Sequence, residues 1–136
     1  MSAIKVSVVE GLKMEALAPT AANQVVVDAP KELGGGGADM SPTDLLAVSL
    51  VSCMIVMMGL KARQLGANMA GTTGEVSKTM AMEPVMHISS FHVKIRCPNV
   101  GDPAHQAELQ KAAEQCPVHH TLSPECKQDI AFEWGA

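Results

Sequence analysis

The stretch SPTDLLAVSLVSCMIVMMGL (residues 41–60) is the most apolar part of this 136-residue chain. It opens with the signals of a helix start, because Ser41 can act as the N-cap, Pro42 suits the first helical position and Asp44 completes a capping box. The pattern predicts a helix that begins here and ends at Gly66. Since its residues are apolar on nearly all sides, we expect a long, buried central helix.

The same stretch is too short for a membrane span. Residues 45–60 would form a helix of about 24 Å, against a hydrocarbon core of roughly 30 Å. They also include Ser49 and Ser52. The first residues alternate polar and apolar side chains and lack the continuous apolar core of a signal peptide. We therefore expect a cytoplasmic protein with no membrane partner, whose cysteines are reduced at rest.

Alternating apolar and polar residues predict strands on both sides of the helix. They lie at residues 4–8, 12–16, 24–28, 75–82, 91–97 and 130–134. The glycine-rich residues 29–40 fit no nucleotide-binding pattern and predict a flexible loop. A further helix is expected to begin at Asp102-Pro103. This order of elements predicts an α+β fold in a single domain that covers residues 1–136.

The composition argues against nucleic acid as a partner. The net charge is −4, and the chain has only two Phe and one Trp. A protein of this charge has no general attraction for phosphate backbones, and so few aromatic residues provide no platform for stacking bases.

Cys116 occurs in the stretch CPVHHTL (residues 116–122) and is the first candidate for thiol chemistry. Pro117 favours the first position of a short helix, which would place Cys116 at the N-cap. Unpaired N–H groups and the helix dipole stabilise a thiolate at that position. A small apolar residue that fills space at a helix junction is the alternative, and the two interpretations have equal weight at this point.

Three other cysteines have weaker local arguments for reactivity. Cys53 lies in the middle of the apolar helix, where burial raises the pKa of a thiol unless a cation is near. Cys97 ends a strand on its apolar face and is expected in the core. Cys126 lies in a polar segment and is expected to be an exposed bystander.

A metal site is the less favoured interpretation of this region. Cys116, Cys126 and one of His119 and His120 could supply three ligands, but no Cys-x-x-Cys pair is present and the spacing matches no structural zinc pattern. The two adjacent histidines diverge by about 100° on a helix and cannot face one ligand together. We expect neither a metal nor a bound cofactor.

The helix start and mid-helix cysteine in SPTDLLAVSLVSC (residues 41–53), followed later by CPVHHTL, resemble the OsmC/Ohr family of thiol-dependent hydroperoxide reductases. The start VVEGLKM (residues 8–14) and the order of strands and helices also fit, particularly the OsmC-like (YhfA-type) branch. The resemblance implies an OsmC-like fold, with antiparallel sheets around a long central helix. It also implies an intertwined homodimer with active sites at the subunit interface.

The family's two-cysteine mechanism carries over onto Cys53 and Cys116. The resemblance implies that Cys53 attacks a hydroperoxide substrate and becomes a sulfenic acid, which Cys116 resolves to a disulfide. A dithiol reductant then reopens that disulfide. His119 becomes a possible supporting residue.

The activating residues of the family are changed in this sequence. Its peroxidases use an arginine from the N-terminal sheet and a glutamate near the start of the central helix to hold the thiolate. At the glutamate's position stands Thr43, with Asp44 next to it, and neither of the two arginines lies in the N-terminal strands. Lys13 could replace the arginine as a cation, but it cannot make the bidentate fork.

Two functional hypotheses follow from these residues. The first is a cytoplasmic, homodimeric thiol peroxidase that uses Cys53 and Cys116. The second, favoured by the changed activating pair and the Met-rich helix, is a non-enzymatic redox sensor or small-ligand binder on the same fold.

Overall fold

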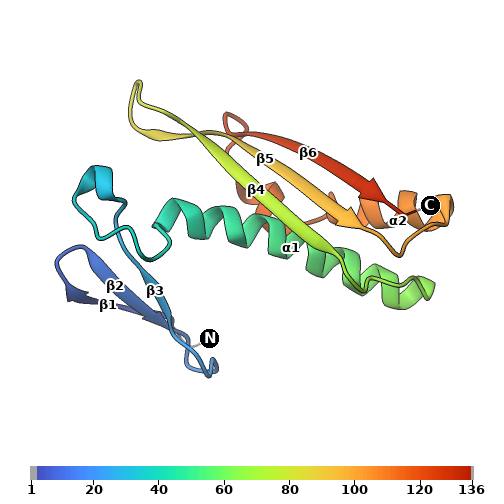
Figure 1. Ribbon diagram of the computed structural model, residues 1–136, viewed down its shortest axis with the longest axis horizontal. Helices are drawn as coiled ribbons and strands as arrows, with labels where there is room; N and C mark the ends of the chain where they lie inside the picture. The colour runs from blue at the N-terminus through green and yellow to red at the C-terminus, as the bar shows by residue number, and fades with distance from the viewer. Residues whose placement is uncertain (1–2, 136) are drawn as a thin grey trace. The chain divides into compact units, whose positions relative to one another are not determined.

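The computed structural model describes residues 3–135, and its contacts form two compact units, one up to Leu46 and one from Ala47 onward. Each unit contains its own three-stranded sheet (Figure 1). Strands and helices both contribute to the fold, which confirms the predicted α+β class.

The first unit is built on an antiparallel meander. Its strands are β1 (Lys5–Glu10), β2 (Lys13–Leu17) and β3 (Val25–Val27), in the order β1-β2-β3. Gly11 forms the β1–β2 turn with φ of +53°, a left-handed conformation that glycine adopts without a steric cost. All six residues of β1 are exposed in the single chain, including its apolar ones.

The segment predicted as a flexible loop is organised around Asp28, which is only 5% exposed. Its carboxylate accepts a hydrogen bond from the Gly36 N–H at 2.9 Å, and its own N–H donates to the Met40 carbonyl at 3.1 Å. The loop also contains a short 3-10 turn, η1 (Lys31–Leu33). A buried carboxylate needs such partners, and they give this glycine-rich segment a defined conformation.

The long helix α1 (Pro42–Leu65) has both of its predicted ends. At its start the Asp44 carboxylate accepts the Ser41 N–H at 3.1 Å, and the Ser41 hydroxyl accepts the Asp44 N–H at 3.2 Å. This reciprocal pair is a capping box. At its end Gly66 is left-handed, with φ of +72°, and the Ala67 N–H donates to the Ala62 carbonyl.

The second sheet consists of β4 (Thr73–Ala81), β5 (His87–Cys97) and β6 (Lys127–Trp134), in the order β4-β5-β6. Strands β4 and β5 pair antiparallel, whereas β5 and β6 pair parallel. The expectation of purely antiparallel sheets is therefore wrong for this unit. The chain returns to the N-terminal end of β5 through two helices, α2 (Pro103–Ala113) and α3 (Pro117–Thr121). Such a crossover is required because β5 and β6 are parallel.

The core of the second unit lies between one face of this sheet and the helices. Alternate β5 side chains point inward and pack against α1, which runs along the sheet in Figure 1. The largest fully buried side chains are Phe91, Leu50, Met54, Met58, Ile95, Leu109, Cys97 and Cys116. Sulfur-containing side chains thus supply half of this set, in a chain with few aromatic residues.

The opposite side of α1 is not covered within the single chain. Val56 is 59% exposed and Leu60 50% exposed, so the burial expected on nearly all sides is observed on one side only. With 24 residues, α1 extends beyond residues 45–60 and is long and apolar enough to meet the length and composition criteria for a membrane span, which corrects the expectation that it is too short. Because six of its residues lie in the protein core, we interpret it as a core helix.

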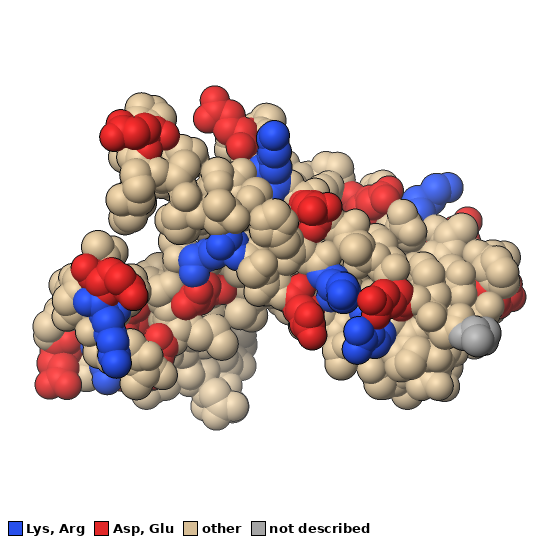
Figure 2. All heavy atoms as spheres, turned by 45° about the horizontal axis from the view of Figure 1, so that its top comes forward, with Lys and Arg blue, Asp and Glu red and all other residues tan. Residues whose placement is uncertain are grey.

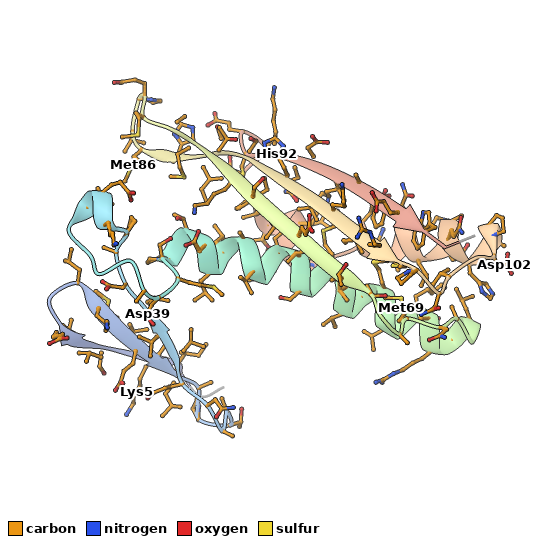
Figure 3. The ribbon with its side chains drawn as sticks, viewed as in Figure 1. Lys5, Asp39, Met69, Met86, His92 and Asp102 are labelled. Atoms are coloured by element: carbon orange, nitrogen blue, oxygen red, sulfur yellow. The ribbon has the colours of Figure 1, made fainter. Side chains whose placement is uncertain are left out.

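The outer face of the second sheet is polar. His92, which Figure 3 labels, is exposed on β5, and the exposed Lys94 and Arg96 follow it at every second position of the strand. Both of these cations reach Glu133 on β6, at 3.5 Å and 2.6 Å. Figure 2 shows one face of the molecule, on which acidic and basic side chains are interspersed.

Candidate functional site

Cys53 lies in the middle of α1, on the side that faces the second sheet and helices. It is partly buried and packs against the hydrophobic core. The helical repeat places Cys53 on the same side as Leu50 and Met57, its neighbours one turn away, which also contact the core.

Cys116 is completely buried and occupies the N-cap of α3, as the following proline predicts. Its N–H donates to the Ala113 carbonyl at the end of α2. Its sulfur accepts the His119 N–H at 3.4 Å. Cys116 therefore joins α2 to α3 and has a fixed position in the core.

Cys53 is a neighbour that acts on the Cys116 thiol. Burial raises the pKa of the Cys116 thiol, and the neighbouring side chain of Cys53 raises it further. The N–H groups of His119 and Val118 act in the opposite direction. The thiolate stabilisation expected at this N-cap is thus present but is outweighed by burial.

Gln128 is a site residue that the sequence analysis missed. It is hydrogen-bonded through its amide oxygen to the Nδ1 of His119, and its amide NH₂ donates to the His119 carbonyl at 3.0 Å. In this arrangement the proton of the neutral imidazole is on Nδ1. The available signal was the polar Gln128 on the same face of β6 as the apolar Ile130 and Phe132.

His120 contacts the C-terminal end of α2. Its Nε2 contacts the Glu114 carbonyl at 2.8 Å, and its ring packs edge-on against that of His119 at 5.2 Å. Within residues 3–135, no three His, Cys, Asp or Glu side chains come together in a group that could hold a metal ion.

The remaining cysteines lie outside the pair. Cys97 is buried, as expected, and burial raises the pKa of its thiol more than a hydrogen bond with Thr72 lowers it. Cys126 is partly buried and packs against the core, which corrects the expectation of an exposed bystander. Its segment turns inward just before β6, and burial raises the pKa of its thiol as well.

Thr43, Asp44 and Lys13 have local partners in the first unit. The Thr43 hydroxyl lies 3.1 Å from the Ser41 hydroxyl, next to the Asp44 carboxylate of the capping box. The Lys13 ammonium pairs with the Asp39 carboxylate at 3.4 Å. These contacts tie the three side chains to the helix start and to the loop before it.

Comparisons with known proteins show which family and fold this chain is similar to. The family model described as OsmC-like protein matches residues 34–131. A search of curated proteins found no match. A solved structure described as an osmotic stress induced and detoxification response protein from Psychrobacter arcticus is 36% identical and has a TM-score of 0.92. The match covers 98% of this chain and 96% of that one.

Two further solved structures share the fold at lower identity. An OsmC like protein from Mycoplasma pneumoniae is 16% identical with a TM-score of 0.81, over 98% of this chain and 96% of that one. An organic hydroperoxide resistance protein from Legionella pneumophila is 14% identical with a TM-score of 0.74, over 98% of both chains.

Proposed function

Because the chain belongs to the OsmC-like protein family, we propose that it reduces organic hydroperoxides with the thiols of Cys53 and Cys116. The observation that carries this proposal is that Cys53 packs against the core cluster that contains Cys116, and that its side chain raises the pKa of Cys116. Two cysteines from separate elements, α1 and the start of α3, are neighbours there without being joined. A resolving thiol has to be close to the sulfenic acid that it attacks.

The proposed reaction has three steps. The Cys53 thiolate attacks the terminal oxygen of a hydroperoxide, the O–O bond breaks, and the alkoxide leaves and takes a proton to become an alcohol. Cys116 then attacks the Cys53 sulfenic sulfur, which forms the disulfide and releases the hydroxyl group as water. A dithiol reductant supplies two electrons and two protons, restores both thiols and becomes a disulfide itself.

The first step requires an ionised Cys53, because the thiolate and not the thiol is the nucleophile. The apolar surroundings of Cys53 favour an organic hydroperoxide over hydrogen peroxide, since an alkyl group gains free energy when it leaves water for apolar side chains. The Legionella relative is described as an organic hydroperoxide resistance protein.

We further propose that the working protein is a cytoplasmic homodimer. In the single chain the apolar side chains of Val56 and Leu60 on α1 are exposed, and so are those of Val6 and Val8 on β1. A second copy of the chain is the partner that the resemblance to the family implies. Such exposed apolar surfaces are typical of subunit interfaces.

Peroxide consumption by the reduced protein tests the catalytic proposal. We expect the wild-type protein to consume cumene hydroperoxide and to form a Cys53–Cys116 disulfide, detected by mass spectrometry. The Cys53→Ser variant should react more slowly by at least about tenfold, since a serine hydroxyl is not ionised at neutral pH. Cys126→Ser is the matched control and should react as the wild type does.

A Cys53→Ser variant that consumes the hydroperoxide at the wild-type rate would refute the assignment. The alternative function, a redox sensor or a small-ligand binder, is favoured by the raised pKa of Cys116 and the absence of an arginine from the N-terminal strands. A sensor would be oxidised once per molecule, whereas a peroxidase turns over repeatedly with a dithiol such as dithiothreitol or dihydrolipoamide. Repeated turnover therefore separates the two.

A further inference from the structure

The tip of the β4–β5 hairpin carries a cluster of methionines that the proposed function does not use. Three of the chain's ten methionines, Met80, Met82 and Met86, lie in the stretch MAMEPVM (residues 80–86). In the single chain they are 37%, 65% and 47% exposed. Methionine usually fills gaps in a core, as other methionines of this chain do on α1. A group of exposed thioethers at a turn therefore calls for another explanation.

The register of the hairpin places the three side chains on one face. Strands β4 and β5 pair antiparallel, and the pair nearest the turn is Ala81 with His87. Continued by one step, this register puts Met82 opposite Met86. Side chains alternate between the two faces of a strand, so Met80, two residues before Met82, shares its face.

This arrangement brings the sulfurs within reach of one another. Residues directly opposite in an antiparallel pair have Cβ atoms about 4.5–5.5 Å apart. Two positions along a strand on one face correspond to roughly 7 Å. Methionine has three rotatable bonds beyond its backbone, which is enough to bridge such separations. The three thioethers can therefore converge on a single ion.

A hydrogen bond fixes the turn beside this cluster. The Nδ1–H of His87 donates to the Val85 carbonyl at 2.6 Å. Because His87 pairs with Ala81, it lies on the opposite face from the methionines. The bond thus restrains the backbone next to Met86 without placing the imidazole among the sulfurs. Figure 3 labels Met86 at this end of the hairpin.

We propose that Met80, Met82 and Met86 bind Cu(I) through their thioether sulfurs. Thioethers are soft ligands that select Cu(I), whereas hard cations such as Mg²⁺ prefer oxygen. The exposed Glu83 lies in the same turn and adds a negative charge near the cation. This site uses neither cysteine nor histidine, so the sequence patterns of those residues do not reveal it. It is independent of the proposed thiol chemistry.

NMR of the methionine methyl groups tests the site directly. The whole chain, labelled with [methyl-¹³C]methionine, would be titrated with Cu(I) under anaerobic conditions with ascorbate as reductant. Single Met→Leu variants assign the signals. We expect the signals of Met80, Met82 and Met86 to move together and to saturate together. Met40, which is 52% exposed outside the cluster, is the internal control, and its signal should not move.

Equilibrium dialysis against Cu(I) measures the stoichiometry. The thiols also bind Cu(I), so the comparison is between variants that keep all four cysteines. Met80→Leu/Met82→Leu/Met86→Leu should bind one Cu(I) per chain fewer than the wild type, and Met40→Leu should bind as much as the wild type. Leucine has a similar volume, so the variants should fold, which thermal melting checks.

The affinity and the choice of metal give two further readouts. Met82→Leu alone should weaken Cu(I) binding at the cluster by at least about tenfold, the loss typical of altered metal sites. Zn²⁺ should leave the three methyl signals in place, because it binds thioethers poorly.

Two results would overturn the proposal. The first is a set of methyl signals that Cu(I) leaves unchanged, as expected if a second copy of the chain covers the cluster. The second is a triple variant that binds as much Cu(I) as the wild type. Equal shifts with Zn²⁺ would likewise count against it, because they would point to the Glu83 carboxylate or the His87 imidazole as ligands.

Discussion

At the residue scale, the site depends on how one buried sulfur is surrounded. Cys116 accepts the His119 N–H, has a second thiol as a neighbour and has no exposed surface. The first of these features favours its thiolate, whereas burial and the neighbouring sulfur oppose ionisation. Because burial is the largest of these effects, a helix N-cap alone does not make this cysteine the first nucleophile.

Gln128 provides the prediction at this scale. Gln128→Leu removes both hydrogen bonds to His119. The partly buried backbone carbonyl and imidazole Nδ1–H of His119 then lose these partners. We expect the free energy of unfolding, measured with urea, to fall by about 1–3 kcal/mol. Disulfide formation after peroxide treatment should also become slower, because α3 loses the contact that fixes Cys116 relative to β6.

Gln110→Leu is the matched control for that experiment, because Gln110 is exposed on α2. It makes the same chemical change without removing the hydrogen bonds to His119. If both variants lose the same stability, the hydrogen bonds between Gln128 and His119 contribute nothing measurable.

The two cysteines could be paired from the sequence only through the resemblance to a family. No periodicity relates Cys53 in α1 to Cys116 before α3, since their proximity depends on how helix and crossover pack. Gln128 was missed for a related reason. A polar residue in an apolar row is visible in the sequence, but its partner on another element is not.

At the element scale, the packing of α1 against the second sheet depends on a glycine. A Cβ atom at Gly74 on β4 would lie 2.7 Å from a methyl carbon of Val51 and 3.0 Å from the end of Ile55. A larger residue at this position would have to displace these side chains, so the glycine allows α1 and β4 to pack closely here.

Gly74→Ala should therefore destabilise the protein. We expect a loss of about 1–3 kcal/mol in the free energy of unfolding, because the new methyl group pushes the buried Val51 out of place. The double variant Gly74→Ala/Val51→Ala should be more stable than the sum of the two single changes predicts. Strict additivity in urea unfolding would contradict the steric explanation.

The ends of the elements were more predictable than their pairing. The capping box of Ser41 and Asp44, the glycine after α1 and the cap of Asp102 on α2 (labelled in Figure 3) were all visible as local signals. The parallel pairing of β5 with β6 was not predicted. It depends on the path of the chain through α2 and α3, which alternation within a strand does not encode.

At the scale of the whole molecule, exposed apolar surface predicts association. Val56→Glu places a charge on the uncovered side of α1. Analytical ultracentrifugation should show a dimer for the wild type and a shift toward monomer for this variant, since an interface excludes an unpaired charge. Gln110→Glu adds the same charge at an exposed site of α2 and should leave the dimer intact. A monomeric wild type would contradict the proposed assembly.

The cysteines predict how stability depends on pH. Burial raises the pKa of Cys97, Cys116 and Cys126, so the native protein keeps these thiol protons to a higher pH than the unfolded chain does. Their contribution to the free energy of unfolding is complete below the ordinary thiol pKa of about 8.5 and is lost as the pH rises above it.

Under reducing conditions we therefore expect the melting temperature to fall as the pH rises from about 8 to 10. The Cys97→Ala variant should show a smaller slope against pH, whatever its stability at neutral pH, because it lacks one of the three groups. A slope equal to that of the wild type would mean that Cys97 does not contribute to the pH dependence.

Because Cys53 and Cys116 lie far apart in the chain, the proposed disulfide would also change the stability of the protein. Cys53 belongs to α1 and Cys116 to the crossover between β5 and β6, so a bond between them would enclose β4, β5 and α2 in one covalent ring. Cross-links of this kind restrict the unfolded chain and typically stabilise a domain by about 2–4 kcal/mol. Each reaction with a peroxide would thus leave the protein cross-linked and more stable until the disulfide is reduced. The dithiol that opens the ring returns the protein to its more easily unfolded form.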